Sequence, residues 1–162
     1  MPLAVSATTL RGRSTEVSVN ERTWRFKLRP GVRFHDGTPL RPTDIAFSIT
    51  RAREGRFWAV FAAPVERVDV IDDETIDIVT RAPDPLLPRK MSKILIMSEA
   101  WSRAHGAERA HDLAATGGDF FAQRNANGTG FMTLREHGGQ RTVLVRNRAW
   151  WGRSESNLDE AV

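Results

Sequence analysis

Histidine, cysteine and serine supply most catalytic and metal sites, and in this sequence none of them is arranged for such a role. The chain has no cysteine, which excludes a disulfide framework and a thiolate metal site. His105 and His111 are six positions apart, which does not match the i, i+4 spacing of helical zinc ligands. No serine lies in a nucleophile-elbow context. We therefore predict that the protein is not an enzyme and needs no metal or cofactor.

Two groups of charged residues have a structural explanation. Five acids lie between residues 69 and 77, but they lack the regular alternation and the central glycine of a calcium-binding loop. We expect the solvated end of a hairpin there. His35 and Asp36 precede Gly37, and an Asp-Gly pair is a signal for a tight turn. We expect His35 and Asp36 to cap this turn rather than to act together in catalysis.

Aromatic residues could bind a ligand without any reaction. Phe57, Trp58 and Phe61 lie close together in the sequence and could line an apolar pocket. Packing into the hydrophobic core is the alternative, and we favour it for these three residues as well as for Trp150 and Trp151. The first three residues remain the aromatic candidates for ligand contact.

Gly128, Thr129 and Gly130 form a short glycine-rich motif within the turn segment 125–130. A phosphate-binding loop would have a longer glycine pattern and a helix directly after it, and no helix is predicted here. The motif is therefore a weak signal for phosphate, and it joins the aromatic residues as a candidate for ligand contact.

The stretch Thr23–Glu54 contains the clearest local signals for regular structure. Residues 24–28 alternate between apolar and polar side chains, which predicts a strand with one apolar face. Pro30-Gly31 and Asp36-Gly37 then predict two turns, because proline lacks a backbone N–H and glycine accepts a positive φ. A helix is expected to follow these turns.

The predicted helix has an N-terminal signal and an apolar face. Thr43 is expected as the N-cap, and Asp44 lies in the first turn, where the helix dipole favours an anion. Ile45, Ile49 and Ala52 recur at helical spacing and would form the buried face.

The remaining sequence predicts further hairpins. Residues 16–19 would pair with the Trp24 strand, and residues 65–80 would form a second hairpin. Residues 131–146 would form a third, with its turn at 137–140.

Between these hairpins the signals are mixed. Prolines interrupt regular structure over residues 83–88, and Ser98 would cap a helix that ends near Gly106. Residues 111–121 have no clear pattern. Hairpins with helices inserted between them predict an α+β fold that is mainly antiparallel.

Size and composition favour one globular domain. The chain has 162 residues, of which 40% are hydrophobic and 27% are charged. Its net charge is +4, but the basic residues are spread along the chain and mixed with acids, unlike the basic stripe of a nucleic-acid-binding protein. No stretch approaches the ~20 apolar residues of a membrane span. Residues 1–13 lack the regions of a signal peptide, so none is expected here.

Three long segments, taken in order, resemble the extracellular solute-binding proteins of family 5, which are peptide, oligopeptide and nickel receptors of ABC importers. The first segment is Thr23–Glu54, TWRFKLRPGVRFHDGTPLRPTDIAFSITRARE. The second is Val65–Pro88, VERVDVIDDETIDIVTRAPDPLLP. The third is Asn125–Gly152, NANGTGFMTLREHGGQRTVLVRNRAWWG, in which Phe131-Met132 replaces the family's usual proline and aromatic residue.

The resemblance implies a partial lobe of a type II periplasmic-binding-protein-like fold over residues 16–152. We expect a poorly ordered segment at 1–15 and a frayed tail at 153–162. Family members are several times longer and have two lobes that close around a solute, which they deliver to a membrane permease without any reaction. The implied partners are a peptide or other small solute and the ABC permease subunits, with only indirect membrane contact. The implied location is the periplasm.

The resemblance also bears on the candidate residues. In related receptors an aromatic residue after the first helix approaches the bound peptide, and Phe57, Trp58 or Phe61 would occupy that position. The segment Gly128–Gly130 lies near the crossing between the lobes. Two other functions remain as alternatives: a stand-alone α+β interaction module without transport activity, and a basic nucleic-acid-binding domain suggested only by the net charge.

Overall fold

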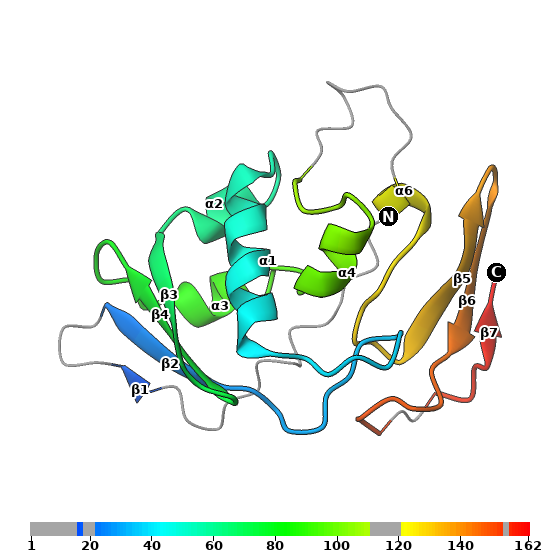
Figure 1. The fold of residues 1–162 in the computed structure, drawn as a ribbon, viewed down its shortest axis with the longest axis horizontal. Helices are drawn as coiled ribbons and strands as arrows, with labels where there is room; N and C mark the ends of the chain where they lie inside the picture. Colours follow the sequence, from blue (N-terminus) through cyan, green and yellow to red (C-terminus); the bar gives the residue numbers. More distant parts are fainter. Residues whose placement is uncertain (1–15, 18–21, 111–120, 154–155) are drawn as a thin grey trace.

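Two antiparallel sheets lie at opposite ends of the molecule, with the helices between them (Figure 1). The computed structural model describes residues 16–17, 22–110, 121–153 and 156–162. One sheet has four strands in the order β1-β2-β4-β3, and the other has three in the order β5-β6-β7. This arrangement confirms the predicted α+β class with mainly antiparallel hairpins.

The four-stranded sheet is built from the two N-terminal hairpins. Its strands are β1 (Glu16–Val17), β2 (Thr23–Lys27), β3 (Val65–Asp72) and β4 (Thr75–Thr80). β4 lies between β2 and β3, and all of its residues are buried. A central strand that is covered on both faces has no solvent side, which explains why its apolar run is not cleanly alternating.

Helix α1 (Pro42–Glu54) covers this sheet, and it begins one residue before the predicted N-cap. Thr43 is not the cap, because Pro42 occupies the first helical position, where its missing N–H is not needed and its φ already fits. The cap is Arg41, whose backbone N–H donates to Asp44 Oδ2 at 2.8 Å. The predicted buried face is confirmed, since Ile45, Ile49 and Ala52 are all buried.

One hydrophobic core joins α1, the four-stranded sheet and two short helices, α2 (Ala59–Ala62) and α3 (Leu87–Met91). Prolines were expected to interrupt regular structure over residues 83–88. This is wrong for Leu87 and Pro88, because they begin α3, and proline fits the first turn of a helix. The core side chains all come from the first part of the chain: Phe26, Leu28, Phe34, Ile45, Ile49, Ala52, Ala62, Val65, Ile76, Ile78, Leu87, Met91, Ile94 and Ile96.

Two further helices lie between α1 and the second sheet (Figure 1). The Ser98 cap is confirmed, since its side chain accepts from Trp101 N at 3.2 Å at the start of α4 (Glu99–Ala104). Gly106 follows at a φ of 64°, which suits a helix end. α6 (Phe121–Arg124) comes after residues 111–120, which lie outside the described part of the chain.

The three-stranded sheet contains β5 (Met132–Gly138), β6 (Arg141–Arg146) and β7 (Glu160–Ala161). The third hairpin is confirmed, but its turn is shorter than predicted, because His137 and Gly138 pair with Thr142 and Arg141. The prediction that residues 153–162 fray is wrong for Glu160–Ala161, which form β7. Backbone bonding to β6 orders β7, and Arg146 N donates to Asp159 O at 2.8 Å. The expected disordered segment 1–15 lies outside the described residues.

Candidate functional site

The two sheets meet through a junction formed by the loop after β2 and the turn segment before β5. His35 N donates to Gly128 O at 2.8 Å, and Gly128 N donates to His35 Nδ1 at 3.2 Å. Because Nδ1 accepts, the ring proton is on Nε2, which lies 3.1 Å from Gly130 O and donates to it. Burial lowers the pKa of His35 and so favours this neutral form.

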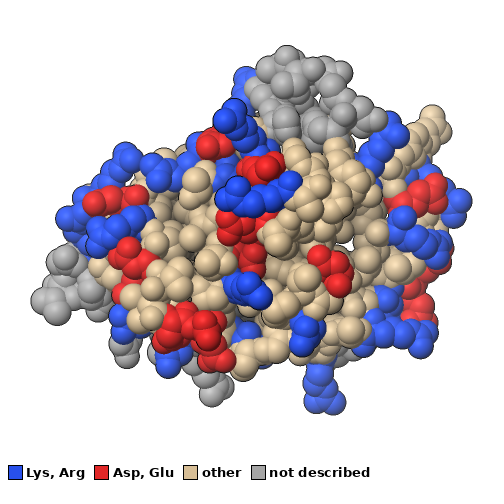
Figure 2. Space-filling model, viewed as in Figure 1, with Lys and Arg blue, Asp and Glu red and all other residues tan. Residues whose placement is uncertain are grey.

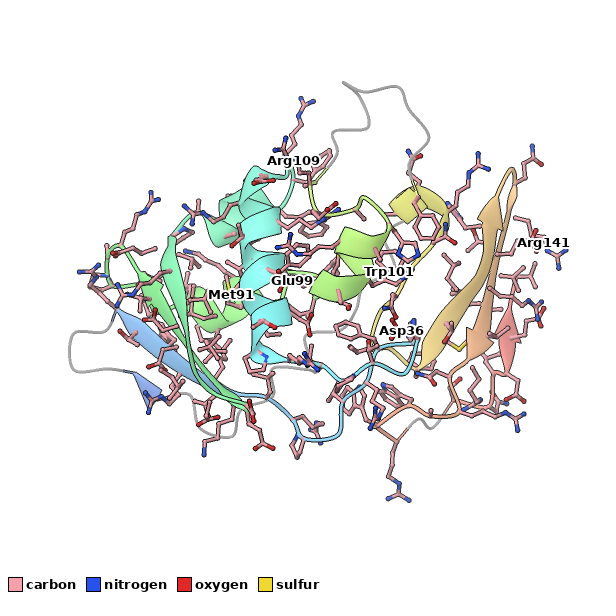
Figure 3. The ribbon with its side chains drawn as sticks, viewed as in Figure 1. Asp36, Met91, Glu99, Trp101, Arg109 and Arg141 are labelled. Carbon is pink, nitrogen blue, oxygen red and sulfur yellow. The ribbon has the colours of Figure 1, made fainter. Side chains whose placement is uncertain are left out.

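Asp36, which lies at the tip of the loop (Figure 3), forms the second half of the junction together with Asn127. Asp36 N donates to Asn127 Oδ1 at 3.1 Å, and Asn127 Nδ2 donates to Asp36 Oδ2 at 2.7 Å. The other carboxylate oxygen of Asp36 accepts from Thr38 N and Oγ1, so the predicted turn-capping role is confirmed for Asp36. The His35 ring bonds to Gly128 and Gly130 instead of capping the turn. Pairing with residues more than ninety positions away is a role that the sequence did not indicate.

The glycine-rich motif lies inside this junction. Thr129 is buried, and its carbonyl accepts from Trp151 Nε1 at 3.0 Å. The carbonyl of Gly130 accepts from Asn147 Nδ2 at 3.2 Å as well as from His35. The structure therefore places Gly128, Thr129 and Gly130 where their backbone holds the two sheets together.

The aromatic candidates lie elsewhere. Phe57 is 78% exposed, whereas Trp58 and Phe61 pack against the core with ring centroids 6.2 Å apart. The loop of the junction precedes α1 in the chain, whereas the aromatic candidates follow its C-terminal end, where α2 lies (Figure 1). The structure does not bring the two predicted groups together.

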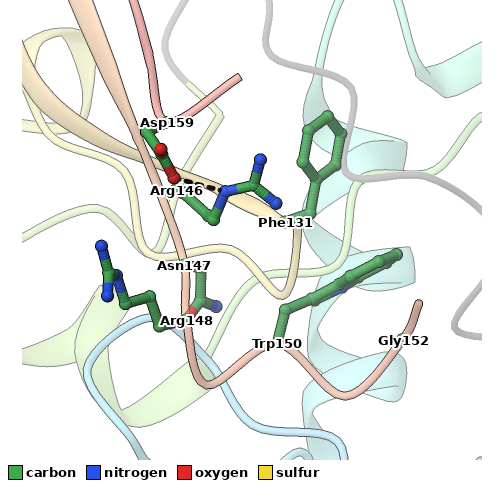
Figure 4. Close-up of a pocket in the computed structure, with 7 residues that line it drawn as sticks. All are labelled: Phe131, Arg146, Asn147, Arg148, Trp150, Gly152 and Asp159. Atoms are coloured by element: carbon green, nitrogen blue, oxygen red, sulfur yellow. Dashed lines mark hydrogen bonds and ion pairs between the residues drawn. The ribbon is translucent and has the colours of Figure 1, made fainter. Parts of the chain in front are cut away.

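A cavity of about 420 Å³ opens beside the junction, between β6 and the chain that follows it (Figure 4). Phe131 and Trp150 form one wall, with ring centroids 5.7 Å apart and planes tilted by 56°. Arg146 lies opposite, where Nε donates to Asp159 Oδ1 at 2.8 Å and Nη2 donates to Ser156 O at 2.7 Å. The lining residues are Phe131, Arg146, Asn147, Arg148, Trp150, Gly152 and Asp159.

Asn147 connects this cavity to the junction. Its backbone N–H donates to Phe131 O at 2.8 Å while its side chain donates to Gly130 O. The cavity wall is therefore fixed to the same backbone that carries His35. This cavity was not predicted from the sequence, although the run of arginine, asparagine and tryptophan at residues 146–151 is a usable signal for it.

The indole of Trp150 is held tightly but is not fully bonded. A Cβ added at Gly152 would lie 2.5 Å from the Trp150 ring, so only glycine allows the ring this position. Trp150 Nε1 is buried and has no hydrogen-bond partner among the described residues. An unpaired buried donor costs on the order of 1–3 kcal/mol.

The described lining of the cavity consists of arginine, asparagine, aspartate, glycine and aromatic residues. Within the described residues, no group of histidines and acids is placed to hold a metal ion. None of the described helices is both long and apolar enough to span a bilayer. On the face shown in Figure 2, basic and acidic side chains are interspersed over both sheets.

The family model "Bacterial extracellular solute-binding proteins, family 5 Middle" matches residues 7–162. Among curated proteins, an ABC transporter peptide-binding protein of Brucella ovis is 31% identical over 90 residues, covering 54% of this chain and 17% of that protein. The HTH-type transcriptional regulator SgrR of Salmonella choleraesuis is 26% identical over 129 residues, covering 78% of this chain and 22% of that protein.

A solved structure shares the fold of the described chain. The binding protein MoaA from A.tumefacien R10, in complex with mannopinic acid, superimposes with a TM-score of 0.73 at 22% identity. The match covers 91% of this chain and 29% of that one. The chain thus spans less than a third of the length of each of these three proteins.

Proposed function

Because the chain belongs to the bacterial extracellular solute-binding proteins of family 5, we propose that it forms part of a non-catalytic receptor that captures peptides for an ABC importer. In this proposal the receptor acts in the periplasm and delivers its solute to the permease subunits. The observation that carries the proposal is the family match over residues 7–162, together with peptide-binding relatives.

The fold supports a receptor role in a specific way. A binding protein must hold its ligand-contacting residues in fixed positions, since each group ordered during binding reduces affinity. In this proposal the junction serves that purpose, because hydrogen bonds through His35 and Asp36 connect one sheet to the other. We propose that residues 16–152 form the lobe segment, with Gly128–Gly130 near the bound solute.

The aromatic candidates give the proposal its most direct residue-level test. Phe57 and Val60 are 78% and 67% exposed, so replacing either by alanine should leave folding intact. If Phe57, with Trp58 and Phe61, contacts the peptide, Phe57→Ala should weaken binding about tenfold, as for an aromatic contact. Val60→Ala is the matched control and should have no effect.

The experiment is calorimetric titration of the purified chain with a tripeptide library, followed by uptake of a labelled tripeptide in cells with and without the gene. Loss of uptake on deletion, restored by the gene, is the expected result, with sugar uptake as the control. Unchanged peptide uptake together with no heat of binding would count against the proposal.

A second candidate function rests on the match to the transcriptional regulator, which covers more of this chain than the Brucella match does. In this case the same fold would sense a solute within a regulator rather than deliver it. Deletion would then change transcript levels when the solute is added, while uptake of the solute would remain unchanged.

A further inference from the structure

We propose that the cavity between Phe131, Arg146 and Trp150 binds a small aromatic carboxylate. This inference goes beyond the proposed function, because it concerns a site within this chain and does not depend on transport. It rests on the charge of the cavity, on its aromatic wall and on its size, which are independent observations.

The described lining residues carry one positive charge in excess. Arg146 and Arg148 both line the cavity, and Asp159 is the only acid among the lining residues that the structure describes. Asp159 is already paired with Arg146 at 2.8 Å. Arg148 is exposed and has no hydrogen-bond or ion-pair partner among the residues that the structure describes. An exposed arginine of this kind at the edge of a cavity is suited to a carboxylate, which its planar group can bind through two parallel hydrogen bonds.

The aromatic wall is suited to a flat apolar group. Phe131 is 40% exposed although it lies against Trp150, so part of its ring surface has no protein partner. The rings are tilted against each other by 56°, which gives the wall two differently oriented faces. An aromatic ring placed against either face would gain the offset or edge contacts that aromatic pairs prefer.

The size of the cavity is that of a small-molecule site. Its volume of about 420 Å³ falls in the range of about 300–1,000 Å³ for small-ligand pockets. The absence of a side chain at Gly152 is part of this shape, since a Cβ there would push the Trp150 ring out of place. A single ring that carries one carboxylate group fits within this volume and suits the two kinds of wall.

The test uses benzoate as the probe and follows the tryptophan indole N–H signals of the ¹⁵N-labelled chain by NMR. The chain has five tryptophans, and Trp150→Phe identifies the Trp150 signal by its loss. We expect benzoate to shift this signal with a Kd on the order of 1 mM, as for a very small ligand. Benzamide, which has the same ring without the charge, should bind about tenfold more weakly.

Two variants separate the site from general charge effects. Arg148→Gln should weaken benzoate binding about tenfold, because it removes the unpaired charge. Arg141→Gln is the matched control, since Arg141 is also an exposed arginine but lies at the far end of the hairpin (Figure 3), and it should leave the Kd unchanged. Gly152→Ala should reduce binding by displacing the Trp150 ring.

Each contrary outcome would overturn the inference. The first is equal Kd values for benzoate and benzamide, and the second is an equal effect of the two arginine variants on the Kd for benzoate. The third is a Trp150 signal that does not move at 20 mM benzoate, which is about twentyfold above the expected Kd. Failure of benzoate binding would leave tripeptide binding and uptake unaffected, so the failure of this inference is distinguishable from that of the proposed function.

Discussion

The two sheets of this protein are stabilised in different ways. In the four-stranded sheet every residue of β4 is buried, and helix α1 packs over it to form the hydrophobic core. In the three-stranded sheet only Val143 is fully buried, and four of the seven residues of β5 are exposed. The first sheet is therefore held by burial of apolar surface, whereas the second depends on its hydrogen-bonded connection to the first through the junction.

The ion pairs of the two sheets also differ in burial, and the better buried pair belongs to the four-stranded sheet. Arg25 and Asp77 face each other on β2 and β4, where Nε and Nη2 donate to the two carboxylate oxygens at 2.8 Å, and Asp77 is nearly buried. Arg135 and Glu160 pair at 2.9 Å on the three-stranded sheet, and both are exposed. Solvent screening makes an exposed pair contribute little, so similar distances do not mean similar energies.

The largest effect is expected in the core of the first sheet. Ile76→Ala should lower the free energy of unfolding by about 3–4 kcal/mol, because Ile76 is fully buried and its removal leaves a cavity beneath α1. Urea denaturation of the variant and the parent measures the difference. A loss below about 1 kcal/mol would contradict the comparison, since it would mean that the site collapses without cost.

A smaller effect is expected at the junction. Asn127→Ala should cost about 1–3 kcal/mol, because it leaves Asp36 without two of its hydrogen-bond partners in a half-buried site. Asn125→Ala is the matched control, since the Asn125 side chain donates to Phe121 O in an exposed position. Urea denaturation should show a clear loss for the first variant and a loss within about 0.5 kcal/mol for the second. Equal losses would show that the junction does not couple the sheets.

The junction should also make stability depend on pH. Burial lowers the pKa of His35 below its ordinary value of 6.5, so between these two values the unfolded chain binds more protons than the folded one. The stability due to neutral His35 is therefore present above pH 6.5 and is lost as the pH falls towards the lowered pKa. Protonation also removes the Nδ1 acceptor of Gly128 N.

Urea denaturation between pH 5 and pH 8 checks this dependence. His35→Gln keeps the other three histidines, so the difference between parent and variant isolates His35. The parent should lose stability relative to the variant as the pH is lowered through 6.5. The contribution of Asp44 to stability decreases as the pH rises, because burial raises the pKa of its carboxyl group. Both proteins contain Asp44, so this contribution cancels in the difference between them. Parallel pH profiles would contradict the assigned role of His35.

The smallest effect is expected for the exposed ion pair of the second sheet. Arg135→Gln should change stability by no more than about 0.5 kcal/mol. Arg25→Gln is the comparison variant and should cost about 1–3 kcal/mol, because it leaves the nearly buried carboxylate of Asp77 without its charged partner. Thermal denaturation of both variants and the parent, in low and in high salt, measures the two losses of stability. Equal costs would contradict the difference in screening between the two sheets.

Local structure was largely determined by the sequence itself. The strand at Thr23–Lys27, the turn at Gly37, the apolar face of α1 and the Ser98 cap all form as predicted. They depend on side-chain periodicity and on turn and cap residues, which act over a few positions. The resemblance to family 5 rested on the same segments and is confirmed by the family match.

Tertiary structure decided which distant segments meet. His35 bonds to Gly128 across 93 positions, and the cavity unites Phe131 with Arg146 and Asp159. Pairing with β6 likewise orders β7, where the local sequence predicts a frayed end. A backbone N–H or carbonyl takes whichever partner the packed chain brings within reach, and no local pattern encodes that choice. The sequence thus determined the longer hairpins, helix α1 and the family, while packing alone decided strand β7, the junction and the cavity beside it.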